Sequence, residues 1–140
     1  MNLLKFCRYI PRLFFKKGLP LNLIFFITSK CNARCRHCFF WREINKSEVR
    51  LTLPEIEKIA KSVPSLLTLS LTGGEPFLRA DLAEIALIFS RFTSIANLQI
   101  PTNGLLTDQI VKISQEILER CRRDIRFFVG VSLDDLDERH

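Results

Sequence analysis

Four short apolar runs alternate with amphipathic stretches along the chain, and no other feature limits its fold so strongly. The runs are Leu21–Thr28, Leu66–Leu71, Asn97–Pro101 and Ile125–Leu133. The first run is nearly continuous, which is typical of a strand buried on both faces. Strands that alternate with helices predict an α/β fold in which right-handed crossovers build a parallel sheet.

Three helices are predicted between these strands from their N-terminal signals. Thr52 and Glu55 form a capping-box pattern that opens a helix to about Val63, with Pro54 in its first turn. Asp81 and Glu84 form a second capping-box pattern, which opens a helix to about Phe92. A third helix is predicted over Thr107–Arg120.

A distinctive group of residues follows each predicted strand. Cys31–Cys38 follows the first strand, Gly73–Pro76 the second and Thr102–Gly104 the third, while Ser132–Asp135 stands at the end of the fourth. In parallel α/β sheets, ligands bind beyond the carboxyl ends of the strands. We therefore expect these four groups to lie together at one edge of the sheet and to form the functional site.

Three cysteines share one loop. Cys31, Cys35 and Cys38 have the spacing C-x3-C-x2-C. Three thiolates on one loop can hold three corners of a cubane iron–sulfur cluster and leave one iron open to a ligand. Lys30 precedes the first of them, and Arg34 and Arg36 flank the second. These cations would offset the negative charge of the thiolates and of a bound cluster.

Two other interpretations of the cysteines stay open at this point. In one, His37 joins them in a structural zinc site of Cys3His composition, although the adjacent His37 and Cys38 cannot easily reach one metal together. In the other, the three are unrelated buried cysteines.

Composition limits the class of protein. The 140 residues are 47% hydrophobic, which is the balance of one ordinary globular domain, and no apolar run is long enough for a membrane span. Five cysteines, three of them within eight residues, suit a metal or cluster site in a reducing compartment better than a set of disulfides. No secretory signal is evident, so we expect a cytoplasmic protein.

The net charge of +6 comes from the N-terminus. Residues 1–30 hold six Lys or Arg and no acid, whereas residues 31–140 hold fifteen of each sign. A neutral domain argues against a nucleic-acid partner. Residues 1–18 are predicted to be a basic amphipathic extension, which packs on the domain or contacts a membrane surface or a partner. Residues 19–140 are predicted to be the domain itself.

The cysteine spacing and the later motifs together resemble the radical S-adenosylmethionine (radical SAM) superfamily. Cys31–Cys38 resembles its signature loop, Gly73–Pro76 its GGE motif and Thr102–Gly104 its common TNG sequence. Val131–Asp134 resembles its fourth-strand segment, and the likeness covers about residues 20–140. The resemblance implies part of a TIM-type barrel, with about four of six β/α units present.

The resemblance also implies roles for single residues around a [4Fe–4S] cluster and S-adenosylmethionine. Cys31, Cys35 and Cys38 would hold the cluster, whose open iron would take the amino and carboxylate groups of the cofactor. The cofactor-binding residues it implies are His37 near the adenine, Gly73, Gly74, Glu75 and Pro76 at the methionine end, Ser132 at the ribose or carboxylate, and Asp134.

Some of these roles have structural alternatives. Glu75 would accept a hydrogen bond from the cofactor's ammonium group or would simply sit at the start of the next helix. A Cβ at Gly73 or Gly74 would obstruct the approach of the backbone to the cofactor. Thr102 and Asn103 are weaker candidates to face the substrate, since Asn-Gly is also a favourable turn.

The implied reaction is a radical one. The reduced cluster would cleave S-adenosylmethionine to methionine and a 5′-deoxyadenosyl radical, which would abstract hydrogen from a substrate. The cofactors carry this chemistry, so no side chain is expected to act as a catalytic acid or base. The partners implied are a reductant such as ferredoxin or flavodoxin and an unknown substrate, in peptide modification or cofactor biosynthesis.

The length departs from the family pattern. The chain supplies four strands and stops where a fifth unit is expected, which predicts a truncated core completed by a C-terminal half or a partner chain. An enzyme of the radical SAM type is therefore the first hypothesis. The alternative is a non-catalytic fragment that binds a metal or a cluster.

Overall fold

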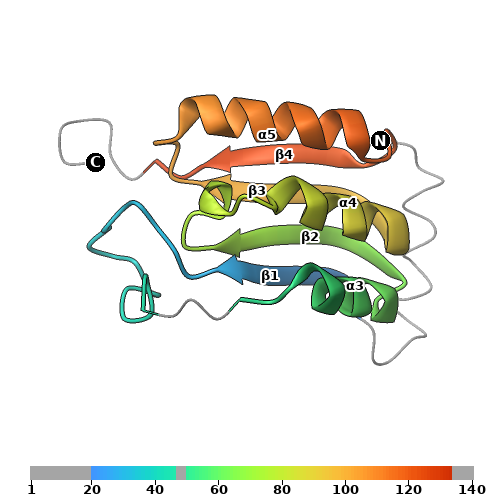
Figure 1. Cartoon of the computed structure of the whole chain (residues 1–140), viewed down its shortest axis with the longest axis horizontal. Helices are drawn as coiled ribbons and strands as arrows, with labels where there is room; N and C mark the ends of the chain where they lie inside the picture. The colour runs from blue at the N-terminus through green and yellow to red at the C-terminus, as the bar shows by residue number, and fades with distance from the viewer. Residues whose placement is uncertain (1–19, 47–49, 134–140) are drawn as a thin grey trace.

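The computed structural model describes residues 20–46 and 50–133, and its strands form one parallel sheet in the order β1-β2-β3-β4. Figure 1 shows this sheet with the helices on one of its faces. The elements are β1 (Asn22–Thr28), α3 (Leu53–Ser62), β2 (Ser65–Gly73), the short 3-10 helix η1 (Pro76–Leu78), α4 (Leu82–Phe92), β3 (Ser94–Thr102), α5 (Thr107–Arg120) and β4 (Arg126–Val131). The predicted α/β alternation and parallel pairing are confirmed.

The helices begin close to the predicted residues, but one predicted cap is wrong. Thr52 and Glu55 do form the capping box of α3, because the Thr52 N–H donates to the Glu55 carboxylate at 2.8 Å. Asp81 occupies the N-cap position of α4 without donating or accepting any capping hydrogen bond through its side chain. Its carboxylate accepts from Arg79 instead, at 2.7 Å and 3.1 Å. The buried guanidinium outcompetes the helix N–H groups for this carboxylate.

The core lies between the sheet and its helices. Buried side chains from both layers form one cluster, which includes Leu69, Leu71, Leu98 and Ile100 from the strands and Ile56, Ala60, Ile85, Phe89, Ile113 and Ile117 from the helices. Burying a side chain of the Leu or Phe type stabilises a fold by roughly 1.5–3 kcal/mol. This packing holds the sheet, and therefore the loops at its carboxyl edge, in place.

The prediction that the first strand is buried on both faces is wrong. Ile24 is 67% exposed and Phe26 is 45% exposed, whereas Ile27 is 3% exposed. Side chains alternate across a strand. Among the described residues the helices lie on one face of the sheet (Figure 1), and Ile27 belongs to the core cluster that includes side chains of these helices. On the other face, the Phe26 ring lies 5.7 Å from the Phe40 ring, centroid to centroid.

Two further sequence predictions concern the N-terminal extension and membrane-spanning helices. The basic extension over residues 1–18 lies outside them, so the division into 1–18 and 19–140 stays a prediction. Within the part of the chain that the structure describes, no helix combines the length and the apolar character that crossing a membrane requires.

Candidate functional site

The predicted residue groups do lie together at the carboxyl edge of the sheet. Gly74 N–H donates to the Thr28 carbonyl at 2.9 Å, and Asn103 N–H donates to the Glu75 carboxylate at 2.8 Å. Ser132 N–H donates to the Thr102 carbonyl at 2.8 Å. These bonds join the segments that follow all four strands, which is the arrangement that the parallel sheet predicts.

The three cysteines lie on the cysteine loop, which we define as residues 29–46, between β1 and the start of α3. None of the three forms a disulfide; Cys35 is exposed, and Cys31 and Cys38 are half-buried. Cys38 N–H donates to the Cys35 carbonyl at 3.2 Å, so a tight turn joins the last two. Within residues 20–46 and 50–133, no three His, Cys, Asp or Glu side chains gather closely enough to hold a single metal ion.

Asn45 holds the first cysteine from the far end of the cysteine loop. Its side-chain amide accepts from Cys31 N–H at 3.0 Å and donates to the Cys31 carbonyl at 3.0 Å. Asn45 has a φ of 61°, a left-handed conformation that Asn tolerates better than most residues do. Sequence reasoning missed Asn45, because an Asn fourteen residues from its partner carries no local signal.

The two glycines of the GGEP loop, residues Gly73–Pro76, are required by the backbone at the end of β1 and the start of the cysteine loop. A Cβ on Gly73, whose φ is +142°, would lie 2.1 Å from the Thr28 carbonyl oxygen. A Cβ on Gly74 would lie 2.3 Å from the Lys30 carbonyl oxygen and 3.0 Å from the Cys31 Cβ. The structure thus gives a physical reason for glycine that is independent of a cofactor, namely backbone contact with the segment that enters the cysteine loop.

Glu75 is a fully buried carboxylate at the centre of this edge. It is 0% exposed, and it accepts from Phe77 N–H at 3.1 Å, from the Thr102 hydroxyl at 2.9 Å and from Asn103 N–H at 2.8 Å. Of the two roles expected for Glu75, the structure contains the cap at the start of η1. A buried carboxylate is tolerated because its oxygens are satisfied, and these bonds tie the loop after β2 to the loop after β3.

Asn103 extends this connection to the cysteine loop. Its side-chain Nδ2 donates to Asn32 Oδ1 at 2.8 Å and lies 3.9 Å from Cys31 Sγ. Thr102, by contrast, is only 3% exposed. The two weakly predicted substrate residues therefore lie at this edge, with the Asn103 amide directed toward the cysteine loop and Thr102 directed toward Glu75.

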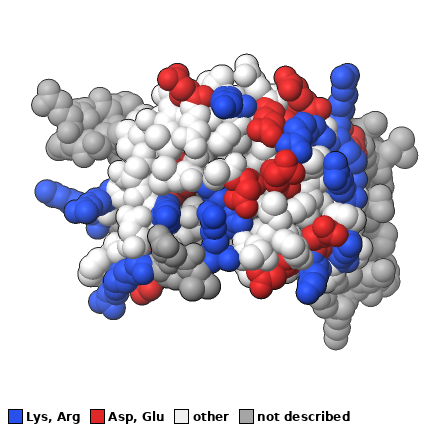
Figure 2. Space-filling model, in the orientation of Figure 1, with Lys and Arg blue, Asp and Glu red and all other residues white. Residues whose placement is uncertain are grey.

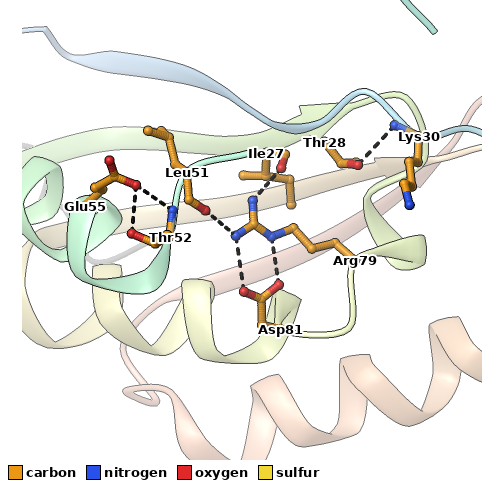
Figure 3. Close-up of polar contacts among 8 residues, drawn as sticks. All are labelled: Ile27, Thr28, Lys30, Leu51, Thr52, Glu55, Arg79 and Asp81. Carbon is orange, nitrogen blue, oxygen red and sulfur yellow. Dashed lines mark hydrogen bonds and ion pairs between the residues drawn. The ribbon is translucent and has the colours of Figure 1, made fainter. Parts of the chain in front are cut away.

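Arg79 closes the base of the cysteine loop, and sequence reasoning missed it. Its side chain is 1% exposed and donates to the Ile27 carbonyl, near the end of β1, and to the Leu51 carbonyl at 2.8 Å, shortly before α3 begins. Figure 3 shows this guanidinium between the two carbonyls, with the Asp81 carboxylate paired to its remaining N–H groups. Arg79 holds the pKa of Asp81 below its usual value, chiefly through this hydrogen bonding.

Positive charge gathers on the cysteine loop. Residues 29–46 contain five Lys or Arg and one Glu. In Figure 2, blue side chains predominate at the end of the molecule that carries this loop in Figure 1, whereas red and blue mix over the helices. A cationic loop of this kind favours anionic groups such as thiolates, a thiolate-ligated cluster or a carboxylate.

The remaining predicted residues differ in exposure. His37 and Ser132 are exposed at this edge, while Pro76 is buried in the first turn of η1. Asp134 lies outside the described residues. Cys121 lies at the end of α5, remote from the cysteine loop in sequence, and burial raises the pKa of its thiol, as is usual for an unreactive cysteine.

Curated relatives share the greater part of this chain. It is 38% identical over 118 residues to a protein of Archaeoglobus fulgidus named "Probable GTP 3′,8-cyclase". The matched region covers 83% of this chain and 36% of that protein. It is 31% identical over 117 residues to a GTP 3′,8-cyclase of Clostridium perfringens, covering 80% and 34%. It is 33% identical over 125 residues to the subtilosin biosynthesis protein AlbA of Bacillus subtilis, covering 85% and 25%. The chain thus spans about a third or less of each.

The fold and the sequence also match at the level of the family. The crystal structure of BtrN in an open conformation superposes with a TM-score of 0.51 at 16% identity, over 81% of this chain and 58% of that one, which is a likeness of fold. This supports the predicted partial TIM-type barrel. The family model of the radical SAM superfamily matches residues 25–140. The chain therefore belongs to the radical SAM superfamily of enzymes.

Proposed function

We propose that this chain holds a [4Fe–4S] cluster on Cys31, Cys35 and Cys38 and binds S-adenosylmethionine beside it, as part of a radical SAM enzyme. One observation carries the proposal: three cysteines outside any disulfide share a cationic loop that is fixed at its base by Arg79 and along its length by Asn45. Such fixing is what a ligand loop needs if it is to present its thiolates in a defined geometry.

The donor set fits a cubane cluster. Three cysteines supply three of the four ligands that a [4Fe–4S] cluster requires, which leaves one iron for the amino and carboxylate groups of S-adenosylmethionine. When bound, the pair supplies one-electron cleavage of the sulfonium to methionine and a 5′-deoxyadenosyl radical, which abstracts hydrogen from the substrate. The protein's part is to position the cofactor and to exclude water.

The chain's own residues divide this work. The exposed His37 and Ser132 are proposed to contact S-adenosylmethionine directly, with Asp134 as a further candidate. Gly73, Gly74 and Pro76 are proposed to shape the wall at its methionine end. Glu75 is proposed to act from behind this wall, because its carboxylate is buried and already accepts three hydrogen bonds.

The proposed partners are a low-potential electron donor such as ferredoxin or flavodoxin and a substrate with an abstractable hydrogen. The substrate is proposed to belong to peptide modification or to cofactor biosynthesis. The relatives support this breadth, because some are named for a nucleotide and one for the biosynthesis of a bacteriocin. Three closely spaced cysteines that form no disulfide favour a reducing compartment, and we propose the cytoplasm.

The test is anaerobic reconstitution of the full chain with iron and sulfide, followed by reduction and EPR with and without S-adenosylmethionine. Wild type is expected to give a [4Fe–4S] signal that changes when S-adenosylmethionine is added. Cys31→Ala is expected to lose it, whereas the matched variant Cys121→Ala is expected to keep it, because Cys121 lies on a helix remote from the loop.

Each other outcome has a definite meaning. A cluster signal that ignores S-adenosylmethionine would support the alternative of a non-catalytic cluster-binding module. Zinc in place of iron, lost on mutation of Cys31, would support the structural metal site. An iron–sulfur signal that survives Cys31→Ala would overturn the ligand assignment.

A further inference from the structure

We infer that Asn103 is a positioning residue for the cluster, which orients the Cys31 ligand and raises the reduction potential through an N–H···S hydrogen bond. The inference rests on the proposed function, because it requires a cluster on Cys31. It assigns Asn103 to the cysteine loop rather than to the substrate, on the strength of contacts made by its side chain.

The orientation of the Asn103 amide is fixed from its own turn. Its Oδ1 accepts from Leu105 N–H at 3.0 Å, so the NH2 group must face the opposite direction. That direction is toward the cysteine loop, where Nδ2 donates to Asn32 Oδ1 at 2.8 Å and lies 3.9 Å from Cys31 Sγ. Sulfur is larger than oxygen, so this distance is at the long end of N–H···S contacts.

The backbone of Asn103 is fixed as well. Its N–H donates to the Glu75 carboxylate at 2.8 Å, and Glu75 is 0% exposed. Glu75 N–H in turn donates to the Lys30 carbonyl at 2.7 Å, immediately before Cys31. Cys31 is therefore tied to the loop after β3 by two routes, one through the buried carboxylate and one through the Asn103 side chain.

A second donor already faces the same sulfur. Ala33 N–H donates to Cys31 Sγ at 3.4 Å, a local bond that belongs to the cysteine loop itself. The Asn103 amide adds a donor from the loop after β3, seventy-two residues away in sequence. Reduction adds one negative charge to a thiolate-ligated cluster, so donors directed at its sulfurs stabilise the reduced form and raise the potential.

The test is an EPR-monitored redox titration of the reconstituted full chain with the variants Asn103→Ala and Asn103→Asp. At a fixed ambient potential, the ratio of reduced to oxidised cluster is expected to fall about threefold to tenfold in Asn103→Ala, since a net hydrogen bond contributes about that much. Tenfold corresponds to about 59 mV for a one-electron couple. The ratio should fall further in Asn103→Asp, because this substitution places a negative charge beside the sulfur.

Asn97 provides the matched control. It lies on β3, the strand that leads to Asn103, and its Nδ2 donates to the Leu67 carbonyl at 3.0 Å, away from the cysteine loop. Asn97→Ala and Asn97→Asp should leave the potential unchanged. If Asn103 served only in folding, its variants would have a lower melting temperature, but the reduction potential would not fall in the order wild type, Asn103→Ala, Asn103→Asp.

The outcomes separate this inference from the proposed function. If wild type forms no [4Fe–4S] cluster, both fail. If wild type forms one and both Asn103 variants titrate at its potential, only this inference fails. If Asn103→Ala loses the cluster but melts at the temperature of Asn97→Ala, the positioning role is supported. The reduction potential of Asn103→Asp, which keeps the Leu105 hydrogen bond, then decides whether Asn103 also tunes the potential. If cluster content and melting temperature fall together in both Asn103 variants, the role is only structural and the inference is overturned.

Discussion

Replacing Arg79 by Met tests whether one buried side chain holds both ends of the cysteine loop. Met keeps most of the aliphatic volume but removes every donor of the guanidinium. The Ile27 and Leu51 carbonyls lose their Arg79 hydrogen bonds, and Asp81 loses its ion pair. A buried acceptor left unsatisfied costs about 1–3 kcal/mol, so the two carbonyls together account for about 2–6 kcal/mol. The Asp81 carboxylate is 29% exposed and becomes hydrated, so it adds little.

We therefore expect Arg79→Met to lower the free energy of unfolding by about 2–6 kcal/mol, a large part of the stability of a small domain. The assay is urea unfolding of the cluster-free chain, followed by circular dichroism. Arg120→Met is the matched control, since Arg120 pairs with Glu84 and Glu116 on the surface and should unfold almost as wild type does. The free energy of unfolding of Arg79→Lys should lie between those of wild type and Arg79→Met, because an ammonium group lacks the planar fork that reaches three partners at once.

The same variants should differ in cluster content. With its base released, the cysteine loop loses the fixed spacing between Ile27 and Leu51, so Arg79→Met should incorporate less iron than Arg120→Met under identical reconstitution. The reasoning is refuted if Arg79→Met unfolds at the same urea concentration as Arg120→Met, because the buried bonds would then contribute nothing to stability.

Two further predictions concern neighbouring residues. Asp81→Asn should be less stable than wild type at pH 7, and the difference should shrink as pH falls below 3.8, the ordinary carboxyl pKa. Arg79 holds the pKa of Asp81 below that value, so its contribution is complete above 3.8 and is lost as the folded carboxylate protonates. Urea unfolding at several pH values measures the difference, and a gap that is constant or widens in acid contradicts it. Gly74→Ala should lower both melting temperature and iron content, because its Cβ would lie 2.3 Å from the Lys30 carbonyl oxygen. Gly130→Ala is its control, since the nearest atom to that Cβ is 3.7 Å away, and equal behaviour of the two variants would contradict the close approach.

Local sequence patterns were enough to predict the strands and helices and the edge of the sheet where the sequence motifs meet. The alternation of apolar runs with amphipathic stretches predicted a parallel sheet, and Thr107–Arg120 forms a helix over the predicted residues. Parallel strands end at one edge, so the groups that follow them had to meet there. The spacing of Cys31, Cys35 and Cys38, together with the later motifs, indicated the radical SAM superfamily, and the family model over residues 25–140 confirms that membership.

What the sequence alone could not determine is which polar groups pair across that edge. Arg79 contacts Ile27 at a separation of 52 residues, and no local pattern encodes such a distance. The same limit hid Asn45, which is fourteen residues from its partner. The predicted cap at Asp81 is wrong for an indirect reason: Arg79 is only two residues away, but its side chain is held in place by the Ile27 and Leu51 carbonyls, and there it binds the Asp81 carboxylate. Exposure of Ile24 likewise depends on which face the helices cover, while an apolar run is the same sequence whether one face or both are buried. Secondary structure follows from short-range periodicity, but hydrogen-bond partners and burial follow from the register of strands far apart in the chain.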